Sequence, residues 1–361
     1  MNQFLELSTY TQYALVLGFF VSFTVSLLIV TTKKYHGKFS LDYDIGIQKI
    51  HKVSAPRIGG IALLMGILVI LPILITNNIK IFSIIIICSL PIFFVALLED
   101  ITGKIRVRIR LLVTALSALF YVYLSGFLIT NVDIEFLNLY LSIPIISIAF
   151  TIFCICGVTN SINLIDGYHG LASGTSIFLL IAIAIIANYY GDIEIYNLSI
   201  ILSSIVLGFF IVNYPFGKLF LGDSGAYLLG FIISIFALIL PIRNEEISPW
   251  VSFAILAYPV IETVFSIIRR FLSKGQYISK PDKNHMHHLM HGIIMEIFNY
   301  FRISRAQNAM TSSIMLFFPM STILWAIYSD FKSSSAIIYI FCFFIFYIII
   351  YFIINGFRFR P

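Results

Sequence analysis

The chain has 361 residues, of which 60% are hydrophobic and 11% are charged, and its formal net charge at pH 7 is +6. Soluble globular domains have about half apolar and about a quarter charged residues, so the composition excludes an ordinary soluble protein and predicts a polytopic membrane protein. The four cysteines lie in apolar runs without the paired spacing of a zinc site or a secreted disulfide framework, which predicts buried small hydrophobic residues.

The chain is predicted to be all-α because its apolar residues fall into runs of roughly the 20 residues that a helix needs to cross a bilayer. Eleven spans are expected, at about 10–30, 58–76, 81–98, 111–129, 142–158, 171–189, 197–213, 225–241, 249–268, 310–328 and 335–355. The first run follows Glu6 and no basic residue, which favours a retained span over a cleaved signal peptide. Residues 1–361 are expected to form a single transmembrane catalytic domain.

Basic residues divide unevenly between the two sides of the membrane. When loops are assigned to alternating sides, 20 Lys and Arg fall on one side and three, Lys80, Arg243 and Lys332, on the other. Because cytoplasmic loops carry the excess of basic residues, the N-terminus is predicted outside and the C-terminus inside. The loops at about 31–57, 99–110, 159–170, 214–224 and 269–309 are then cytoplasmic. The positive charge reflects topology, and no nucleic acid partner is expected.

Two charged clusters lie at the ends of early spans. Arg57 either steers an anionic substrate or anchors the second span. Glu99 and Asp100 are adjacent carboxylates, which repel each other and are costly to desolvate unless a cation or metal holds them. The arginines that alternate along residues 106–110 either supply that cation or bind phosphate, and a solvated charged loop is the alternative.

A polar island at residues 160–174 separates two apolar runs. Asn163 and Asp166 offer hard oxygen donors suited to Mg²⁺, and their spacing puts them on one face if the backbone is helical. Several glycines in the island allow a ligand to approach the backbone closely. His169 is equally consistent with a polar contact to a ligand and with a helix-end hydrogen bond. So many polar groups where hydrocarbon should begin predict a functional site.

The loop between the seventh and eighth spans carries Lys218 and, between two glycines, Asp223. A helix is expected to begin there, and a helix N-terminus preceded by small residues favours phosphate. The simpler alternative is that Asp223 only caps the helix. Its place on the same face as the other acids favours a functional role.

Four of the seven histidines lie within residues 285–291. His-x-His spacing occurs in zinc sites, but no cysteine accompanies it, so imidazoles that contact phosphate oxygens are the favoured interpretation. Glu262 is the one acidic residue placed within a span, and intramembrane acids are functional candidates by default. It is expected either to hold Arg269, two turns along the helix, or to line the site.

Acids for a divalent ion, basic loops and histidines on one membrane surface predict phosphoryl transfer between a lipid and a cytosolic phosphorylated substrate. In five motifs from about residue 50 to residue 290, the chain resembles the polyprenyl-phosphate N-acetylhexosamine-1-phosphate transferases of glycosyltransferase family 4. The resemblance implies a multi-pass protein of the bacterial inner membrane. It implies transfer of a sugar 1-phosphate from a UDP-sugar to undecaprenyl phosphate, with release of UMP and with Mg²⁺ required, Mn²⁺ being the alternative. Such a reaction would initiate a cell-surface polysaccharide, such as a cell-wall polymer or the O-antigen of lipopolysaccharide.

The resemblance also implies roles for individual residues. Catalytic roles fall on Glu99, Asp100 and Asp166, and metal binding on Asn163 and Asp223. Substrate contacts fall on Arg57, Asn213, Phe220, His287 and His288, and the residue pattern itself adds Lys218 and His285.

Two positions depart from the family pattern. The acidic pair is usually two aspartates and here is Glu99-Asp100, which makes Asp100 the stronger catalytic candidate. The second aspartate of the family's Asp-Gly-x-Asp-Gly run is replaced by His169, near the expected nucleotide base. The nucleotide and sugar preference therefore stays open.

A phosphomonoester has its second pKa near about 6, so the lipid phosphate is mostly a dianion at cytosolic pH. We hypothesise a single step in which cations bring two anions together in line, with Asp100 orienting the phosphate or completing its deprotonation. A covalent aspartyl intermediate is the alternative. Two other classes remain open: a secondary transporter, whose ionisable residues would lie near the bilayer midplane, and a non-catalytic relative. The sequence also leaves a homodimer open.

Overall fold

The computed structural model describes residues 7–41, 55–77, 79–272, 284–300 and 306–358. The described residues contain helices and no strand, apart from one isolated antiparallel bridge between Leu41 and Pro56. The helices of the first half are α1 (Thr9–Thr31), α2 (Lys33–Ser40), α3 (Gly60–Thr76), α4 (Lys80–Thr102), α5 (Val107–Ser125), α6 (Glu135–Leu141), α7 (Pro144–Leu164) and α8 (Leu171–Tyr189). The second half holds α9 (Ile193–Asn213), α10 (Gly222–Arg243), α11 (Pro249–Ile255), α12 (Ala257–Leu272), α13 (Met286–Tyr300), α14 (Gln307–Met315), α15 (Phe317–Tyr328) and α16 (Ser333–Arg358).

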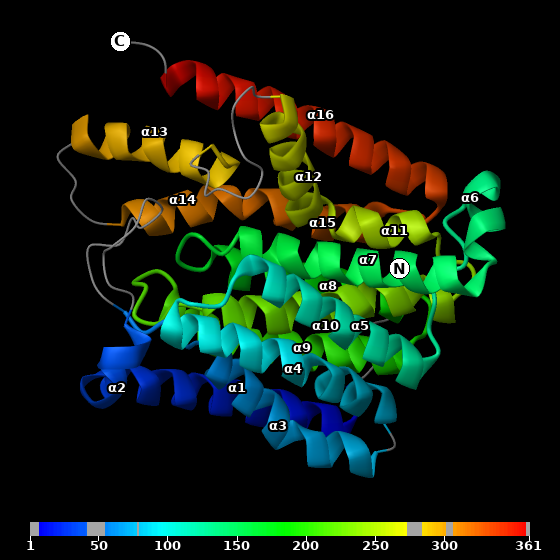
Figure 1. Cartoon of the computed structure of the whole chain (residues 1–361), viewed down its shortest axis with the longest axis horizontal. Helices are drawn as coiled ribbons and strands as arrows, with labels where there is room; N and C mark the ends of the chain where they lie inside the picture. Colours follow the sequence, from blue (N-terminus) through cyan, green and yellow to red (C-terminus); the bar gives the residue numbers. More distant parts are fainter. Residues whose placement is uncertain (1–6, 42–54, 78, 273–283, 301–305, 359–361) are drawn as a thin grey trace.

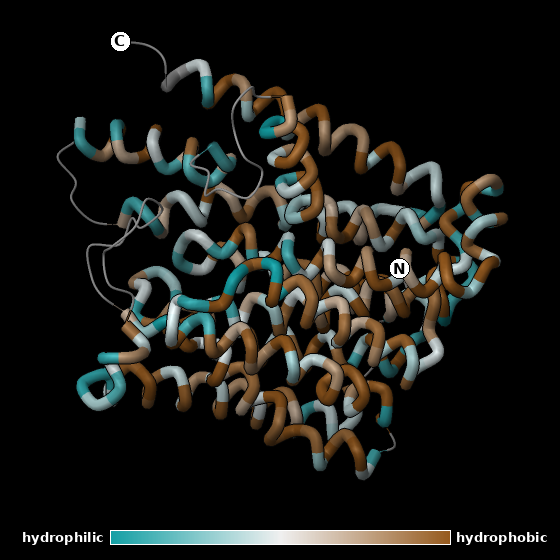
Figure 2. Tube along the Cα trace, viewed as in Figure 1, coloured by the Kyte–Doolittle hydropathy of each residue, from teal (hydrophilic) through white to brown (hydrophobic). Residues whose placement is uncertain are grey.

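The predicted all-α membrane fold is confirmed. Within the described ranges, nine helical segments are long and apolar enough to cross a bilayer, and α11 with α12 makes a tenth if the bent pair counts as one span. The remaining expected span corresponds to α3, whose 17 residues reach the short limit for crossing hydrocarbon. Hydrophilic residues gather toward the ends of the helices, as a membrane-embedded bundle requires (Figure 2).

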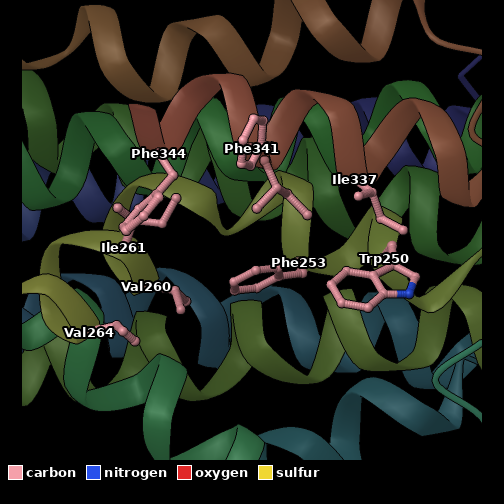
Figure 3. Close-up of a pocket in the computed structure, with 9 residues that line it drawn as sticks. Trp250, Phe253, Val260, Ile261, Val264, Ile337, Phe341 and Phe344 are labelled. Atoms are coloured by element: carbon pink, nitrogen blue, oxygen red, sulfur yellow. The ribbon is translucent and has the colours of Figure 1, made fainter. Parts of the chain in front are cut away.

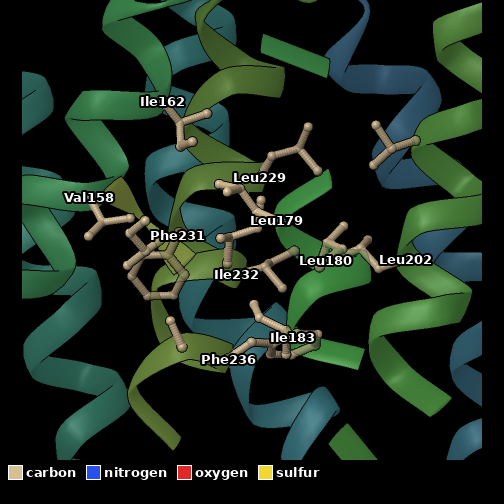
Figure 4. Close-up of a cluster of buried hydrophobic side chains, with 14 of the residues drawn as sticks. Val158, Ile162, Leu179, Leu180, Ile183, Leu202, Leu229, Phe231, Ile232 and Phe236 are labelled. Atoms are coloured by element: carbon tan, nitrogen blue, oxygen red, sulfur yellow. The ribbon is translucent and has the colours of Figure 1, made fainter. Parts of the chain in front are cut away.

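Helix α10 forms the centre of the bundle (Figure 1). Every residue from Gly222 to Leu240 is buried, because α3, α4, α7, α8 and α11 all pack around it. A helix buried on all sides should be mostly apolar, and α10 is, apart from its first turn, the buried Ser234 and Arg243 in its last turn. At Gly230, an added Cβ would lie 2.8 Å from the Cα of Thr159, so glycine lets α10 and α7 approach closely. Figure 4 shows the branched and aromatic side chains that fill the surrounding space.

The apolar run at 249–268 is not one straight span. It breaks at Leu256 into α11 and α12, whose axes meet at 80°. Helix α12 therefore runs steeply across the other long helices (Figure 1). A cavity of about 300 Å³ lies between α11, α12 and α16, and its lining residues, among them Trp250, Phe253 and Phe344, are all apolar (Figure 3). It offers no polar group to a sugar or a nucleotide.

The orientation of the termini stays a prediction that labelling tests. In a chain whose native cysteines are replaced by alanine, Lys332→Cys should react with a membrane-impermeant maleimide in intact cells. Lys104→Cys should react only after permeabilisation, because the strongly basic side should face the cytoplasm. Both lysines are exposed, so accessibility does not limit either reaction. Labelling of Lys104→Cys in intact cells would show that the orientation is the reverse of the predicted one.

Candidate active site

The first turn of α10 is held by two carboxylates from other elements. Asp100, at the end of α4, accepts the backbone N–H groups of Asp223 at 2.8 Å and Ser224 at 2.9 Å. Asp166, in the loop after α7, accepts the N–H of Gly222. The first N–H groups of a helix have no partner within the helix and carry partial positive charge, so buried carboxylates satisfy them well. These N–H groups are thus already occupied, and the expectation that they bind phosphate directly is wrong.

A short backbone pairing brings the segment before α3 against the segment before α10. The N–H of Phe220 donates to Pro56 at 2.8 Å, and the N–H of Gly59 returns to Phe220 at 3.0 Å. Gly222 has φ +73°, and a Cβ there would collide with the Arg57 carbonyl and approach Asp100. Only glycine fits this position without strain. The pairing places Arg57 beside the acids.

Asp223 lies at the centre of a charged network. Its Oδ1 is 3.2 Å from Arg57 Nη2 and 3.1 Å from Asn163 Nδ2, and its Oδ2 pairs with Arg110. The Asp223 side chain is only 9% exposed, and Arg57 also lies 3.7 Å from Asp100. Two guanidinium groups therefore offset the repulsion among carboxylates from three segments. Asp223 is more than a helix cap.

The partner of Arg110 differs from the predicted one. The alternation along residues 106–110 predicted either neutralisation of the Glu99-Asp100 pair or phosphate binding. Arg110 instead pairs with Asp223 and lies over the Tyr227 ring, with its guanidinium carbon 5.7 Å from the ring centroid. Glu99 accepts the N–H of Ile105 at 2.5 Å, which closes the turn between α4 and α5. The two adjacent acids thus have separate partners.

The oxygen donors suit a hard divalent cation in part. Asp223 and Asn163 supply a carboxylate and an amide within contact of each other. In the described part of the chain, no three His, Cys, Asp or Glu side chains form a complete metal cage. Mg²⁺ is commonly held by one or two protein carboxylates together with water and substrate phosphates, so a partial donor set fits Mg²⁺ better than it fits zinc.

The histidine segment at the start of α13 packs on the loop that carries Asp166. His288 Nδ1 lies 2.9 Å from the Tyr168 hydroxyl, and the buried His287 ring packs beside Gly167. The rings of His287 and His288 have centroids 4.5 Å apart. Two histidines from a distant part of the sequence therefore join the acidic centre through residues 167–168. Tyr168 makes this contact and was not among the predicted site residues. Its position inside the polar island at residues 160–174 could have pointed to it.

His285 lies apart from its predicted role as a substrate ligand. Its Nδ1 faces Glu262 at 3.1 Å and Ser266 at 3.0 Å, and its Nε2 faces Arg270 at 3.0 Å. Both ring nitrogens of this buried residue thus point at protein groups. The predicted pairing of Glu262 with Arg269 is absent, because Arg269 contacts Asn284 and Tyr351 instead.

The predicted nucleotide-binding residues surround one loop between α9 and α10. Asn213 donates to Leu219 at 2.7 Å and accepts from the Gly170 N–H at 2.6 Å, so its amide ties two loops together. The Phe220 ring stacks on His169, with centroids 5.5 Å apart and planes at 27°. Lys218 is exposed and lies over the ring of Phe216. Asn213 is thus enclosed by protein, whereas Lys218 is at the surface.

Burial shifts two of the titrating groups outside the spans. Desolvation raises the pKa of Asp166 to about 7, while Arg57 and the Gly222 N–H act in the opposite direction. Desolvation and the neighbouring His288 and His285 lower the pKa of His287 well below its ordinary value. Near neutral pH the centre therefore combines a proton-exchanging carboxyl group with a neutral imidazole.

Comparison with known proteins identifies the family of the chain. The model of glycosyl transferase family 4 matches residues 82–241. A probable undecaprenyl-phosphate N-acetylglucosaminyl 1-phosphate transferase of Bacillus subtilis is 32% identical over 280 residues, which cover 76% of each chain. The chain belongs to glycosyl transferase family 4.

Other relatives fall into two groups by name. An undecaprenyl-phosphate alpha-N-acetylglucosaminyl 1-phosphate transferase of Thermotoga maritima is 31% identical over 67% of this chain and 70% of its own. A phospho-N-acetylmuramoyl-pentapeptide-transferase of Staphylococcus carnosus is 26% identical over 74% of this chain and 87% of its own. The family match covers the acidic centre, and it ends before Glu262 and the histidine segment. The predicted family is confirmed, and membership makes the chain a membrane transferase.

Buried neutral histidines make the free energy of unfolding fall as the pH falls. Burial lowers the pKa of His291 to about 4, against an ordinary value of about 6.5. Between these values the unfolded chain binds more protons than the folded one, so stability present above about pH 6.5 is lost as the pH falls toward 4. His291→Gln, which keeps a polar partner for Thr311, should reduce this loss in thermal unfolding measured from pH 7 to pH 4.5.

Asp166 acts in the opposite direction, because its raised pKa favours the folded state at low pH. That contribution is common to both proteins, so the difference between the two melting curves isolates His291. Equal acid sensitivity in wild type and His291→Gln would contradict the assignment.

Proposed function

We propose that the protein transfers N-acetylhexosamine 1-phosphate from a UDP-sugar to undecaprenyl phosphate, giving undecaprenyl-diphosphate sugar and UMP. The observation that carries this proposal is the convergence of Asp100, Asn163, Asp166 and Asp223 with Arg57 at one end of a bundle of apolar helices. Family membership and the names of the relatives from Bacillus subtilis and Thermotoga maritima support it. The cell-surface polysaccharide that begins with this product would be an O-antigen, another lipopolysaccharide component or a cell-wall polymer.

The position of the centre suits one lipid and one water-soluble substrate. The acids lie where α4 and α7 end and α10 begins, so the site meets both the apolar helices and the polar loops. The same loops carry the basic residues that the positive-inside rule assigns to the cytoplasm. We place the site at the cytoplasmic face of a bacterial inner membrane, where a UDP-sugar arrives from solution and undecaprenyl phosphate from the bilayer.

Mg²⁺ is the proposed cofactor, and Mn²⁺ is the alternative. Asp223 and Asn163 would hold it, since Asp223 Oδ1 and the side-chain amide of Asn163 are in contact and the remaining ligands can come from water and phosphate. A bound divalent ion would offset the charge on the diphosphate and help UMP to leave. Arg57 and Arg110 already neutralise Asp223, and they are also placed to contact phosphate oxygens as those groups arrive.

The proton-handling role moves from Asp100 to Asp166 in this proposal. Both oxygens of Asp100 accept N–H bonds from α10, and its side chain is 0% exposed, so Asp100 positions the helix that carries Asp223. The pKa of Asp166, raised to about 7, suits a group that accepts a proton near neutral pH. Because the lipid phosphate has its second pKa near about 6, little base strength is needed. His287 and His288, which pack on the loop that carries Asp166, would contact the diphosphate.

Two other functions receive less support. A secondary transporter would place its ionisable groups near the middle of the bilayer, whereas these acids lie at helix ends. A muramoyl-pentapeptide substrate is the second candidate, because relatives with that activity in their names match at 26% and 27% identity. Three N-acetylglucosaminyl relatives match at 32%, 31% and 27%, and the two higher identities favour the simpler sugar.

Purified protein should release UMP from UDP-N-acetylglucosamine only when undecaprenyl phosphate and Mg²⁺ are present. Asp223→Asn should lower the rate by about 100-fold or more, because it removes charge from the group that both arginines hold. Coupled UMP detection measures the rate. Asp330→Asn serves as a matched control, since Asp330 is exposed and lies far from the centre in the loop before α16.

Each alternative gives a different result in this assay. If UDP-N-acetylmuramoyl-pentapeptide is the one donor from which UMP is released, the protein belongs with the phospho-N-acetylmuramoyl-pentapeptide-transferases. No release with any UDP-sugar would support a transporter or a non-catalytic relative.

Mixing enzyme with UDP-sugar in the absence of lipid phosphate distinguishes one step from two. We expect no phosphorylated enzyme by intact-mass spectrometry, because Asp100 and Asp223 are fully engaged by N–H and guanidinium groups. Burst release of UMP together with a sugar-phosphate adduct on either aspartate would establish the covalent route.

A further inference from the structure

Glu262 is a fully buried carboxylate outside the acidic centre. Its Oε1 lies 3.1 Å from His285 Nδ1 and accepts the Met286 N–H at 3.2 Å, and its Oε2 accepts the Tyr347 hydroxyl at 2.7 Å. The carboxylate therefore connects α12, the start of α13 and α16. A carboxylate buried without partners is strongly destabilising, so these donors are what allow it to remain there.

The contacts around His285 define its tautomer. Glu262 can only accept at Nδ1, so Nδ1 carries the proton, and Arg270 can only donate at Nε2, so Nε2 is an acceptor. His285 is thus neutral, with both nitrogens in directed contacts. Its ring is parallel to that of His287, with planes at 2° and centroids 5.4 Å apart. The position of His287 therefore depends on that of His285.

The same two helices, α12 and α16, also hold the backbone of this segment. Tyr351 donates to the Asn284 carbonyl at 3.2 Å, and Arg269 contacts both that carbonyl and the Tyr351 hydroxyl. Glu262 takes the Met286 N–H, which has no partner within α13 because it opens the helix. The start of α13 is thereby fixed in rotation as well as in position. Its next residues are His287 and His288, which face the Asp166 loop.

We propose that Glu262 is a positioning residue for the transferase reaction: it fixes His285 as the Nδ1–H tautomer and thereby aims His287 and His288 at the diphosphate of the sugar nucleotide. This inference rests on the proposed function. Helix α16 takes part through Tyr347, so a helix beyond the family match contributes to the geometry of the site. Glu262 itself touches no substrate.

Kinetics of Glu262→Gln in the full-length protein test the proposal. The KM for UDP-N-acetylglucosamine should rise by about 10-fold, as for other outer partners of site histidines, and the KM for undecaprenyl phosphate should stay within about twofold. His285→Asn should have a similar effect. The double variant should be no worse than the more severe single variant, because the two residues act through one contact. Glu246→Gln, at an exposed carboxylate in the loop before α11, is the matched control.

A purely structural role gives a different pattern, namely a lower kcat with both KM values unchanged, a lower melting temperature and additive losses. That pattern, or wild-type kinetics in Glu262→Gln, would overturn the proposal. If Glu262→Gln does not fold, Glu262→Asp decides, because it keeps the charge and withdraws the oxygens by one methylene. An unchanged KM for the sugar nucleotide in Glu262→Asp would then contradict the proposed positioning role of Glu262.

Nitrogen-15 NMR of labelled histidine separates this inference from the proposed function. Wild-type protein should show a signal from a neutral histidine protonated at Nδ1 that is lost in His285→Asn and altered in Glu262→Gln. If the wild type shows this His285 signal but releases no UMP, the contact between Glu262 and His285 exists and the proposed transferase activity is refuted. If the wild type releases UMP normally but lacks the signal, the transferase activity stands and the role of Glu262 is refuted.

Discussion

The start of α10 is the contact on which the rest of the site depends. This helix lies at the centre of the bundle, and the residues of its first turn are buried. Asp100 and Asp166 satisfy its first N–H groups from two other segments. Each such capping contact contributes about 0.5 to 2 kcal/mol in water-exposed helices, and a low local dielectric strengthens it. The requirement to cap one buried helix therefore brings the acids together.

Charge balance then explains the arginines. Asp100, Asp166 and Asp223 would repel one another in a poorly solvated space, and Arg57 and Arg110 reduce that cost by direct pairing. The side chain of Arg57 is 37% exposed and that of Arg110 is 12% exposed, so the first borders solvent and the second belongs to the interior. Arg57 is therefore more than a topological anchor. A phosphate dianion and a divalent cation could enter together with little change in net charge.

The sequence predicted the helices well because run length and hydropathy alone decide which segments enter a bilayer. It missed the break at Leu256, since the residues next to it, Phe253 to Ala257, are all apolar and the nearby Pro259 fits within the first turn of α12. The candidate site residues were found as polar groups in apolar surroundings. Their partners were not, because the pairing of Arg110 with Asp223 joins residues more than a hundred positions apart, and only the packed fold brings them into contact.

One buried atom connects the histidine segment to the proposed chemistry. Among the described residues, His287 Nδ1 has no hydrogen-bond partner although its side chain is almost fully buried. Leaving such an atom unpaired costs about 1 to 3 kcal/mol. Its neighbours His285 and His288 both have hydrogen-bond partners, and the His287 ring lies beside Gly167. Helices α12, α13 and α16 together hold the segment that carries this ring in place.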